Sequence, residues 1–188
     1  ERRVFMRILV VGLGLIGGSL CRALKKYSTH TVVGSDINKD IEFAAMRDVA
    51  IDEVFDGDYS GFDLVIAALF PEASERFFRG NIGSFSKGTL LTDVCGIKGG
   101  FSRRIEALAE ENGLSYIGLH PMAGKEFGGY QNSSADLFQK ANFIIAATEK
   151  SSETEVETLR KLALEIGAGK IVVTTPEDHD KMIAYTSQ

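Results

Sequence analysis

The chain has 188 residues, of which 44% are hydrophobic and 25% are charged, and its net charge is −5 at pH 7. These values are typical of one globular domain or slightly more, and they do not indicate binding to nucleic acid or to an anionic membrane. The sequence shows no 18-residue apolar run, no signal peptide and no disulfide framework for Cys21 and Cys95, so we expect a cytoplasmic protein without a metal site.

The first predicted elements are a strand, a glycine-rich turn and a helix. The apolar, β-branched run 8–11 is typical of a strand buried on both faces, and a helical pattern covers residues 15 to about 26. Between them lies Gly12-x-Gly14-x-x-Gly17, which in this context is a dinucleotide-binding fingerprint. Gly12 permits the turn, Gly14 lets the backbone approach a pyrophosphate, and Gly17 allows close packing of helix on strand.

An acidic residue follows at the spacing expected for a ribose ligand. The N–H groups at the helix start, at Leu15 and Ile16, are expected to face the phosphates. The next strand, 31–35, ends at Asp36, which lies 19 residues beyond Gly17. A carboxylate there accepts hydrogen bonds from the ribose hydroxyls and repels a 2′-phosphate, so NAD is favoured. NADP is the less favoured alternative, supported only by nearby basic residues: Lys25, Lys26, Lys39 and Arg47.

Apolar strands alternate with helical patterns along the rest of the chain. Further strands are predicted at 54–55, 64–68, 89–93, 115–119, 143–147 and 170–174. Further helices are predicted at 39–47, from Pro71, at about 99–111, at 153–166 and from Pro176. This alternation predicts the α/β class, with a doubly wound, mostly parallel sheet of the Rossmann type and helices on both faces.

Ligands of such sheets bind beyond the carboxyl ends of the strands, and two segments there contain candidate site residues. Ala68 and Leu69 follow the fourth strand, where a small side chain lets a cofactor lie against the backbone, although an ordinary strand–helix turn explains them equally well. After the fifth strand, Asp93 is either a helix cap or a catalytic group. Lys98 is expected to pair with Asp93 or with a carboxylate, and Cys95 is a weak candidate nucleophile because no base is adjacent.

The three histidines are interpreted differently. His120 follows the sixth predicted strand at the ligand edge, so we expect it to take part in proton exchange. Glu126 is then either its partner or a solvated carboxylate. His179 lies among acids that suit the first turn of the last helix, and His30 is expected at the surface.

Several motifs together resemble the prephenate/arogenate dehydrogenase family of tyrosine biosynthesis. They span nearly the whole chain in the family's order, and His-Pro-Met-Ala-Gly is the most specific among them. The matching segments are Gly12-Leu-Gly-Leu-Ile-Gly-Gly-Ser19, Asp36, Asp93-Val-Cys-Gly-Ile-Lys98, His120-Pro-Met-Ala-Gly124 with Glu126, and His179-Asp180 leading into Ala184-Tyr-Thr-Ser-Gln188.

The resemblance implies an NAD-dependent oxidative decarboxylation of prephenate to 4-hydroxyphenylpyruvate, or of arogenate to tyrosine. It implies that His120 accepts a hydrogen bond from the ring hydroxyl of the substrate as the carbonyl forms. It places Lys98, Glu126, Gly96 and His179 at positions that line the substrate site. The cofactor positions are Gly12, Gly14, Leu15, Ile16, Gly17, Asp36, Ala68 and Leu69.

Two departures from the family pattern are visible. Gly96 stands where many members have a serine that orients the histidine and the ring hydroxyl. Family enzymes also continue into a helical domain that forms a homodimer and completes the substrate pocket. We therefore expect residues 1–175 to be the dinucleotide-binding domain and residues 176–188 to be the first helix of a truncated domain.

Two other functions remain open. One is an NAD(P)-dependent oxidoreductase of the 3-hydroxyacid dehydrogenase type, against which the His-Pro-Met-Ala-Gly segment argues. The other is a module that binds NAD without catalysis, which the missing helical domain keeps in consideration.

Overall fold

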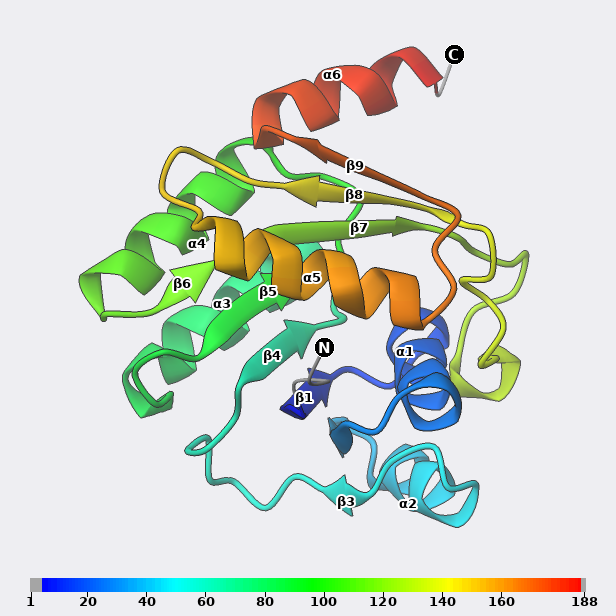
Figure 1. The fold of residues 1–188 in the computed structure, drawn as a ribbon. Coiled ribbons are helices and arrows are strands. Elements are labelled where there is room, and N and C mark those ends of the chain that lie inside the picture. The colour runs from blue at the N-terminus through cyan, green and yellow to red at the C-terminus, as the bar shows by residue number, and fades with distance from the viewer. Residues whose placement is uncertain (1–4, 187–188) are drawn as a thin grey trace.

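The computed structural model describes residues 5–186, whose strands form two sheets (Figure 1). The larger sheet is entirely parallel, and its strands follow one another in the order β3-β2-β1-β4-β5-β6. This is the strand order of a doubly wound dinucleotide-binding fold, so the predicted fold class is confirmed. The strands are β1 Arg7–Val11, β2 Thr31–Ser35, β3 Glu53–Val54, β4 Leu64–Ala67, β5 Leu90–Asp93 and β6 Ser115–Tyr116.

Helices cover both faces of this sheet, because its central strands are apolar on both sides. Along β1, Ile8 and Val10 belong to one hydrophobic cluster with residues of α1 and α5, whereas Leu9 belongs to a second cluster with residues of α3 and α4. Such period-two alternation between two cores is what a doubly covered sheet requires. The helices are α1 Leu15–Tyr27, α2 Lys39–Arg47, α3 Pro71–Asn81, α4 Gly99–Glu111, α5 Glu153–Glu165 and α6 Pro176–Thr186.

The second sheet corrects the predicted strand 115–119. The chain forms the short β6 and then a separate strand, β7 (Gly118–Met122), which pairs antiparallel with β8 (Asn142–Ala146). Strand β9 (Lys170–Thr174) completes this sheet beside β8 (Figure 1). Gly118 is the point of change: a Cβ there would lie 2.8 Å from Cδ of Lys98, so the chain passes closer to that side chain than another residue could. His120 consequently lies within a strand of the second sheet, and the prediction that it follows a parallel strand is wrong.

Helix α6 lies against α4 and buries His179 completely. Within residues 5–186, none of the helices is long and apolar enough to cross a membrane. Ser187 and Gln188, which ended the last motif of the resemblance, lie outside the described residues.

Candidate functional site

The glycine turn after β1 can be built only from glycine at two of its positions. Gly12 has a φ of +91°, and a Cβ on it would lie 2.4 Å from the carbonyl oxygen of Ala68. A Cβ on Gly17 would lie 1.7 Å from the carbonyl oxygen of Gly12. The start of α1 therefore packs closely against the ends of β1 and β4, as the sequence predicts.

Gly14 has a different environment. A Cβ built on it would meet no neighbouring atom within 4 Å among the described residues, and its φ of −80° suits any residue. It precedes α1, which has no side-chain cap and no acidic residue in its first turn. The N–H groups at the start of α1, including those of Leu15 and Ile16, are therefore available to an anion that occupies the open space beside Gly14.

Asp36 lies next to this turn. One carboxylate oxygen accepts the N–H of Leu13 at 2.8 Å, and the other accepts the N–H of Asn38 at 2.9 Å. Leu69 lies on the other side, with its Cδ2 2.8 Å from the position of a Cβ on Gly12. The structure thus brings the glycine turn, Asp36, Ala68 and Leu69 together at the carboxyl ends of β1, β2 and β4.

A chain of three side chains fixes the orientation of His120. Its Nδ1 lies 2.8 Å from Nε2 of His179, and Nδ1 of His179 lies 2.7 Å from a carboxylate oxygen of Asp180. That same oxygen accepts the N–H of Lys98 at 2.8 Å, so it acts as an acceptor. His179 therefore donates from Nδ1 and accepts at Nε2, and His120 donates from Nδ1. This tautomer leaves Nε2 of His120 unprotonated, with no hydrogen bond to any residue between 5 and 186.

The free nitrogen faces the loop after β5. A Cβ on Gly96 would lie 3.6 Å from Nε2 of His120, so residue 96 borders the space into which this nitrogen points. Glycine leaves that space open, and a serine would place a hydroxyl there. His120 thus reaches the carboxyl edge of the larger sheet through its side chain, although its strand belongs to the smaller one.

The environment of His120 keeps its ring neutral. Burial, reinforced by the charge of Lys98 and by the neighbouring His179, lowers the pKa of His120 to about 4. At neutral pH the ring is therefore in the form that can accept a proton at Nε2.

We expect an NMR titration of the His120 ring to give a midpoint near pH 4, whereas an exposed histidine titrates near 6.5. The unfolded chain binds this proton near pH 6.5 and the folded chain only near pH 4. The folded state should therefore lose stability as the pH falls through that interval, and gain none above it. A midpoint near 6.5 would show that the ring is not buried as described.

Lys98 does not face the space beside His120. Its side chain is completely buried, and Nζ lies 2.7 Å from a carboxylate oxygen of Asp93, which is also completely buried. Asp93 accepts further hydrogen bonds from the hydroxyl of Tyr116 and the N–H of Cys95. Of the two expectations for Lys98, the pairing with Asp93 is confirmed, whereas contact with a substrate carboxylate does not fit this geometry.

The contact between Asp93 and Cys95 bears on the roles predicted for both residues. The carboxylate of Asp93 binds the N–H of Cys95 within the loop and does not cap α4, which has no side-chain cap. Burial and the charge of Asp93 raise the pKa of the Cys95 thiol to about 12. The thiol is therefore protonated at neutral pH, which does not favour a nucleophilic role.

The two remaining predicted site residues, His179 and Glu126, differ in their exposure to solvent. His179 is 0% exposed with both ring nitrogens bound to protein groups, so it lies behind His120 and has no nitrogen left for a ligand. Glu126 is exposed on the loop after β7, and among residues 5–186 it has no ion pair or hydrogen bond. Sequence reasoning placed Asp180 within a motif but assigned it no role, and it did not single out Tyr116, for which the sequence offers no signal.

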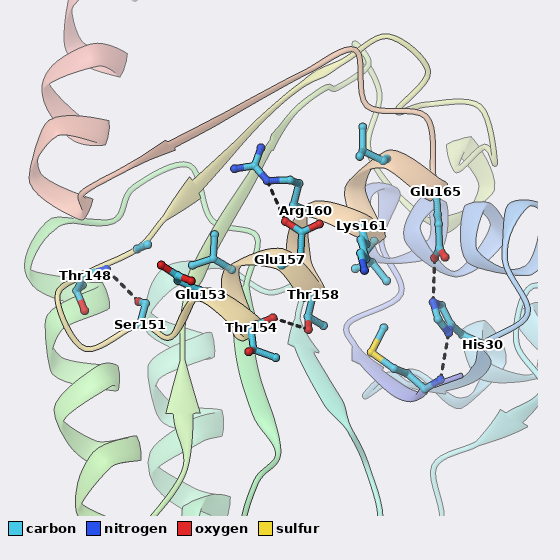
Figure 2. Close-up of a pocket in the computed structure, with 15 residues that line it drawn as sticks. His30, Thr148, Ser151, Glu153, Thr154, Glu157, Thr158, Arg160, Lys161 and Glu165 are labelled. Carbon is cyan, nitrogen blue, oxygen red and sulfur yellow. Dashed lines mark hydrogen bonds and ion pairs between the residues drawn. The ribbon is translucent and has the colours of Figure 1, made fainter. Parts of the chain in front are cut away.

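His30 and a groove along α5 lie apart from this site. The prediction that His30 is a surface residue is wrong: the ring is buried, its Nδ1 accepts the N–H of Met6, and its Nε2 lies 2.9 Å from Glu165. Figure 2 shows this contact at one end of a groove of about 1160 Å³ that follows α5. None of the predicted site residues lines this groove, so it is separate from the site described above.

Comparisons with known proteins agree with one another. A family model described as the nucleotide-binding domain of prephenate dehydrogenase matches residues 20–173. The prephenate dehydrogenase of Bacillus subtilis is 29% identical over 96% of this chain and 49% of its own length. The chain thus spans about half the length of the curated relatives it matches.

Solved structures give the same result for the fold. The arogenate dehydrogenase of Synechocystis superposes with a TM-score of 0.89 at 27% identity, over 97% of this chain and 64% of that one. The prephenate dehydrogenase of Aquifex aeolicus, solved with hydroxyphenyl propionate and NAD+, has a TM-score of 0.88 at 23% identity, with the same coverage. At that lower identity the similarity concerns the fold alone.

Proposed function

Since this chain belongs to the prephenate dehydrogenase family and contains its nucleotide-binding domain, we propose that it binds NAD and serves the oxidative decarboxylation of prephenate or arogenate in tyrosine biosynthesis. The observation that carries the proposal is the geometry of His120, whose Nδ1 is bound to His179 and whose Nε2 faces the space beside Gly96. A base in that place, at the edge where the glycine turn lies, is what a dehydrogenase of a hydroxyl-bearing substrate needs.

The residues around the glycine turn fit a dinucleotide. The open space beside Gly14 and the uncapped start of α1 suit a pyrophosphate, held by the N–H groups of the turn and of Leu15 and Ile16. Each oxygen of Asp36 accepts one backbone N–H and retains a lone pair for a ribose hydroxyl. Gly12, Gly17, Ala68 and Leu69 shape the wall on which the cofactor lies, and Asp36 favours NAD over NADP.

NAD supplies the acceptor for the hydride that leaves the ring carbon bearing the hydroxyl. His120 receives the hydroxyl proton at Nε2, while the O–H electrons form the carbonyl. Loss of the ring carboxylate as CO2 then leaves its bonding electrons in the ring, which becomes aromatic as the carbonyl π electrons move onto the oxygen. That oxygen takes a proton back from His120 and becomes a phenol, so His120 returns to its neutral form. His179 and Asp180 hold the ring of His120 in the accepting tautomer, and Gly96 leaves room for the hydroxyl.

The other predicted substrate residues receive different roles. We assign His179 and Lys98 to positioning, since both are completely buried and bound to protein groups. Glu126 is exposed and free to face the substrate. We also propose a cytoplasmic homodimer, in which residues 1–175 form the dinucleotide-binding domain and the helix from residue 176 begins the dimerising domain.

Formation of NADH tests the activity. The full-length gene product, given NAD with either prephenate or arogenate, should form NADH with at least one of them, and the better substrate identifies the specificity. The 188-residue chain alone should bind NAD but turn over slowly, because it spans about half the length of the curated relatives it matches. Absence of NADH with both substrates in the full-length product would overturn the proposed reaction.

Gly14→Ala should separate cofactor binding from folding. The added methyl enters only open space, so the melting temperature should stay near that of the parent chain, but the methyl occupies the place of the pyrophosphate. We expect the NAD affinity to fall about tenfold or more, as a loss of about 1.4 kcal/mol implies, in calorimetric titrations. Gly80→Ala in α3 is the matched control, because a Cβ there also meets no neighbour and should leave the NAD affinity unchanged.

A further inference from the structure

The ribose side of the site contains a second carboxylate, Glu42 in the first turn of α2, whose side chain is almost completely buried. Oε1 of Glu42 accepts the N–H of Asp36 at 3.0 Å, so it holds the backbone of the predicted ribose ligand. Both oxygens of Glu42 also lie within hydrogen-bonding distance of Nζ of Lys39, at 3.0 and 2.9 Å. Lys39 is itself exposed, with 77% of its side chain accessible.

This arrangement decides what Lys39 can do. A 2′-phosphate on the adenosine ribose is normally accommodated by a cationic side chain near the end of the second strand. Lys39 follows Asp36 closely and is the cation at that position, but its charge is already paired with Glu42. The other basic residues considered for a 2′-phosphate are also paired: Lys25 with Asp52, Lys26 with Asp136 and Arg47 with Asp48.

We infer that Glu42 is a specificity-determining residue that excludes a 2′-phosphorylated dinucleotide, through its own charge beside Asp36 and through its pairing with Lys39. The inference rests on the proposed function, namely that the glycine turn binds a dinucleotide. In this assignment Asp36 contacts the ribose, whereas Glu42 touches no cofactor atom. Glu42 acts through the two groups it binds, the N–H of Asp36 and Nζ of Lys39. Cofactor choice then depends on three charges together.

The test compares the affinities of the 188-residue chain for NAD and NADP by calorimetric titration. Glu42→Gln keeps the shape and a carbonyl acceptor for the N–H of Asp36, but it removes the negative charge and releases Lys39. We expect the ratio of Kd for NADP to Kd for NAD to fall by up to about fivefold, the upper end of the effect of one ion pair with an exposed partner. Glu42→Met, which fills a similar volume without charge, should give the same shift and replaces Glu42→Gln if that variant does not fold.

A second substitution distinguishes the charge of Lys39 from a general disturbance of the site. Lys39→Met should change the ratio less than twofold by itself, because Lys39 is already paired, but it should reverse most of the gain when combined with Glu42→Gln. An unchanged ratio in the folded Glu42 variants, with NAD still bound, overturns the inference and leaves the proposed function in place. A parent chain that binds neither dinucleotide overturns the proposed function and the inference with it.

Discussion

Replacement of His120 by asparagine should lower kcat of the full-length gene product about 100-fold or more, the usual scale for general acid–base assistance. Asparagine keeps a polar side chain but has no nitrogen that accepts the hydroxyl proton. The affinity for NAD should barely change, because Nε2 of His120 points toward residue 96, whereas the cofactor is assigned to the glycine turn and Asp36. Steady-state kinetics and calorimetric titration of NAD with the same variant measure both effects.

His30→Asn is the matched control for this experiment. His30 is also a buried histidine, bound to Met6 and Glu165, but it lies apart from the site. Its replacement should lower the melting temperature and leave kcat per folded molecule nearly unchanged. If His120→Asn behaves in the same way as His30→Asn, with lost stability and intact turnover, His120 is a structural residue and the proposed mechanism is wrong.

Among the proposed substitutions, replacement of Lys98 by methionine should cause the largest loss in the free energy of unfolding. The side chains of Lys98 and Asp93 are both 0% exposed, and their pairing balances two charges that have left water. Removal of one partner leaves Asp93 as an uncompensated buried carboxylate, which typically costs about 3–5 kcal/mol in the free energy of unfolding. Urea denaturation of the 188-residue chain measures this loss.

Two further variants test whether the unpaired charge of Asp93 causes this loss of stability. The combined replacement Asp93→Asn and Lys98→Met removes both charges and should recover a large part of the lost stability. Lys150→Met breaks an exposed ion pair with Glu110 and should change the free energy of unfolding very little. A small effect of Lys98→Met, comparable to that of Lys150→Met, would contradict the buried pairing of Lys98 with Asp93.

The linear order of elements was readable from the sequence because each element depends on local pattern. One contiguous segment contains the apolar run of β1, the glycine turn, α1 and the acid at the end of β2. The close contacts that require glycine at positions 12 and 17 lie within this segment and with Ala68 and Leu69 after β4. The alternation of strands and helices then leaves few topologies, since parallel crossovers keep one hand. The family resemblance rested on the same kind of local motif.

Only the tertiary structure decided how His120 is presented. The sequence cannot show that the chain leaves the larger sheet at Gly118, because β7 pairs antiparallel with residues of β8 that lie 20 to 28 positions away in the chain. Nor does it show that His179 is buried between His120 and Asp180, since the three residues meet only when α6 packs against α4. The sequence by itself determined which side chains can do chemistry. Packing determined which of them are free to do it. The side-chain nitrogens of Lys98 and His179 are bound to buried protein groups, whereas Nε2 of His120 has no such partner among the described residues.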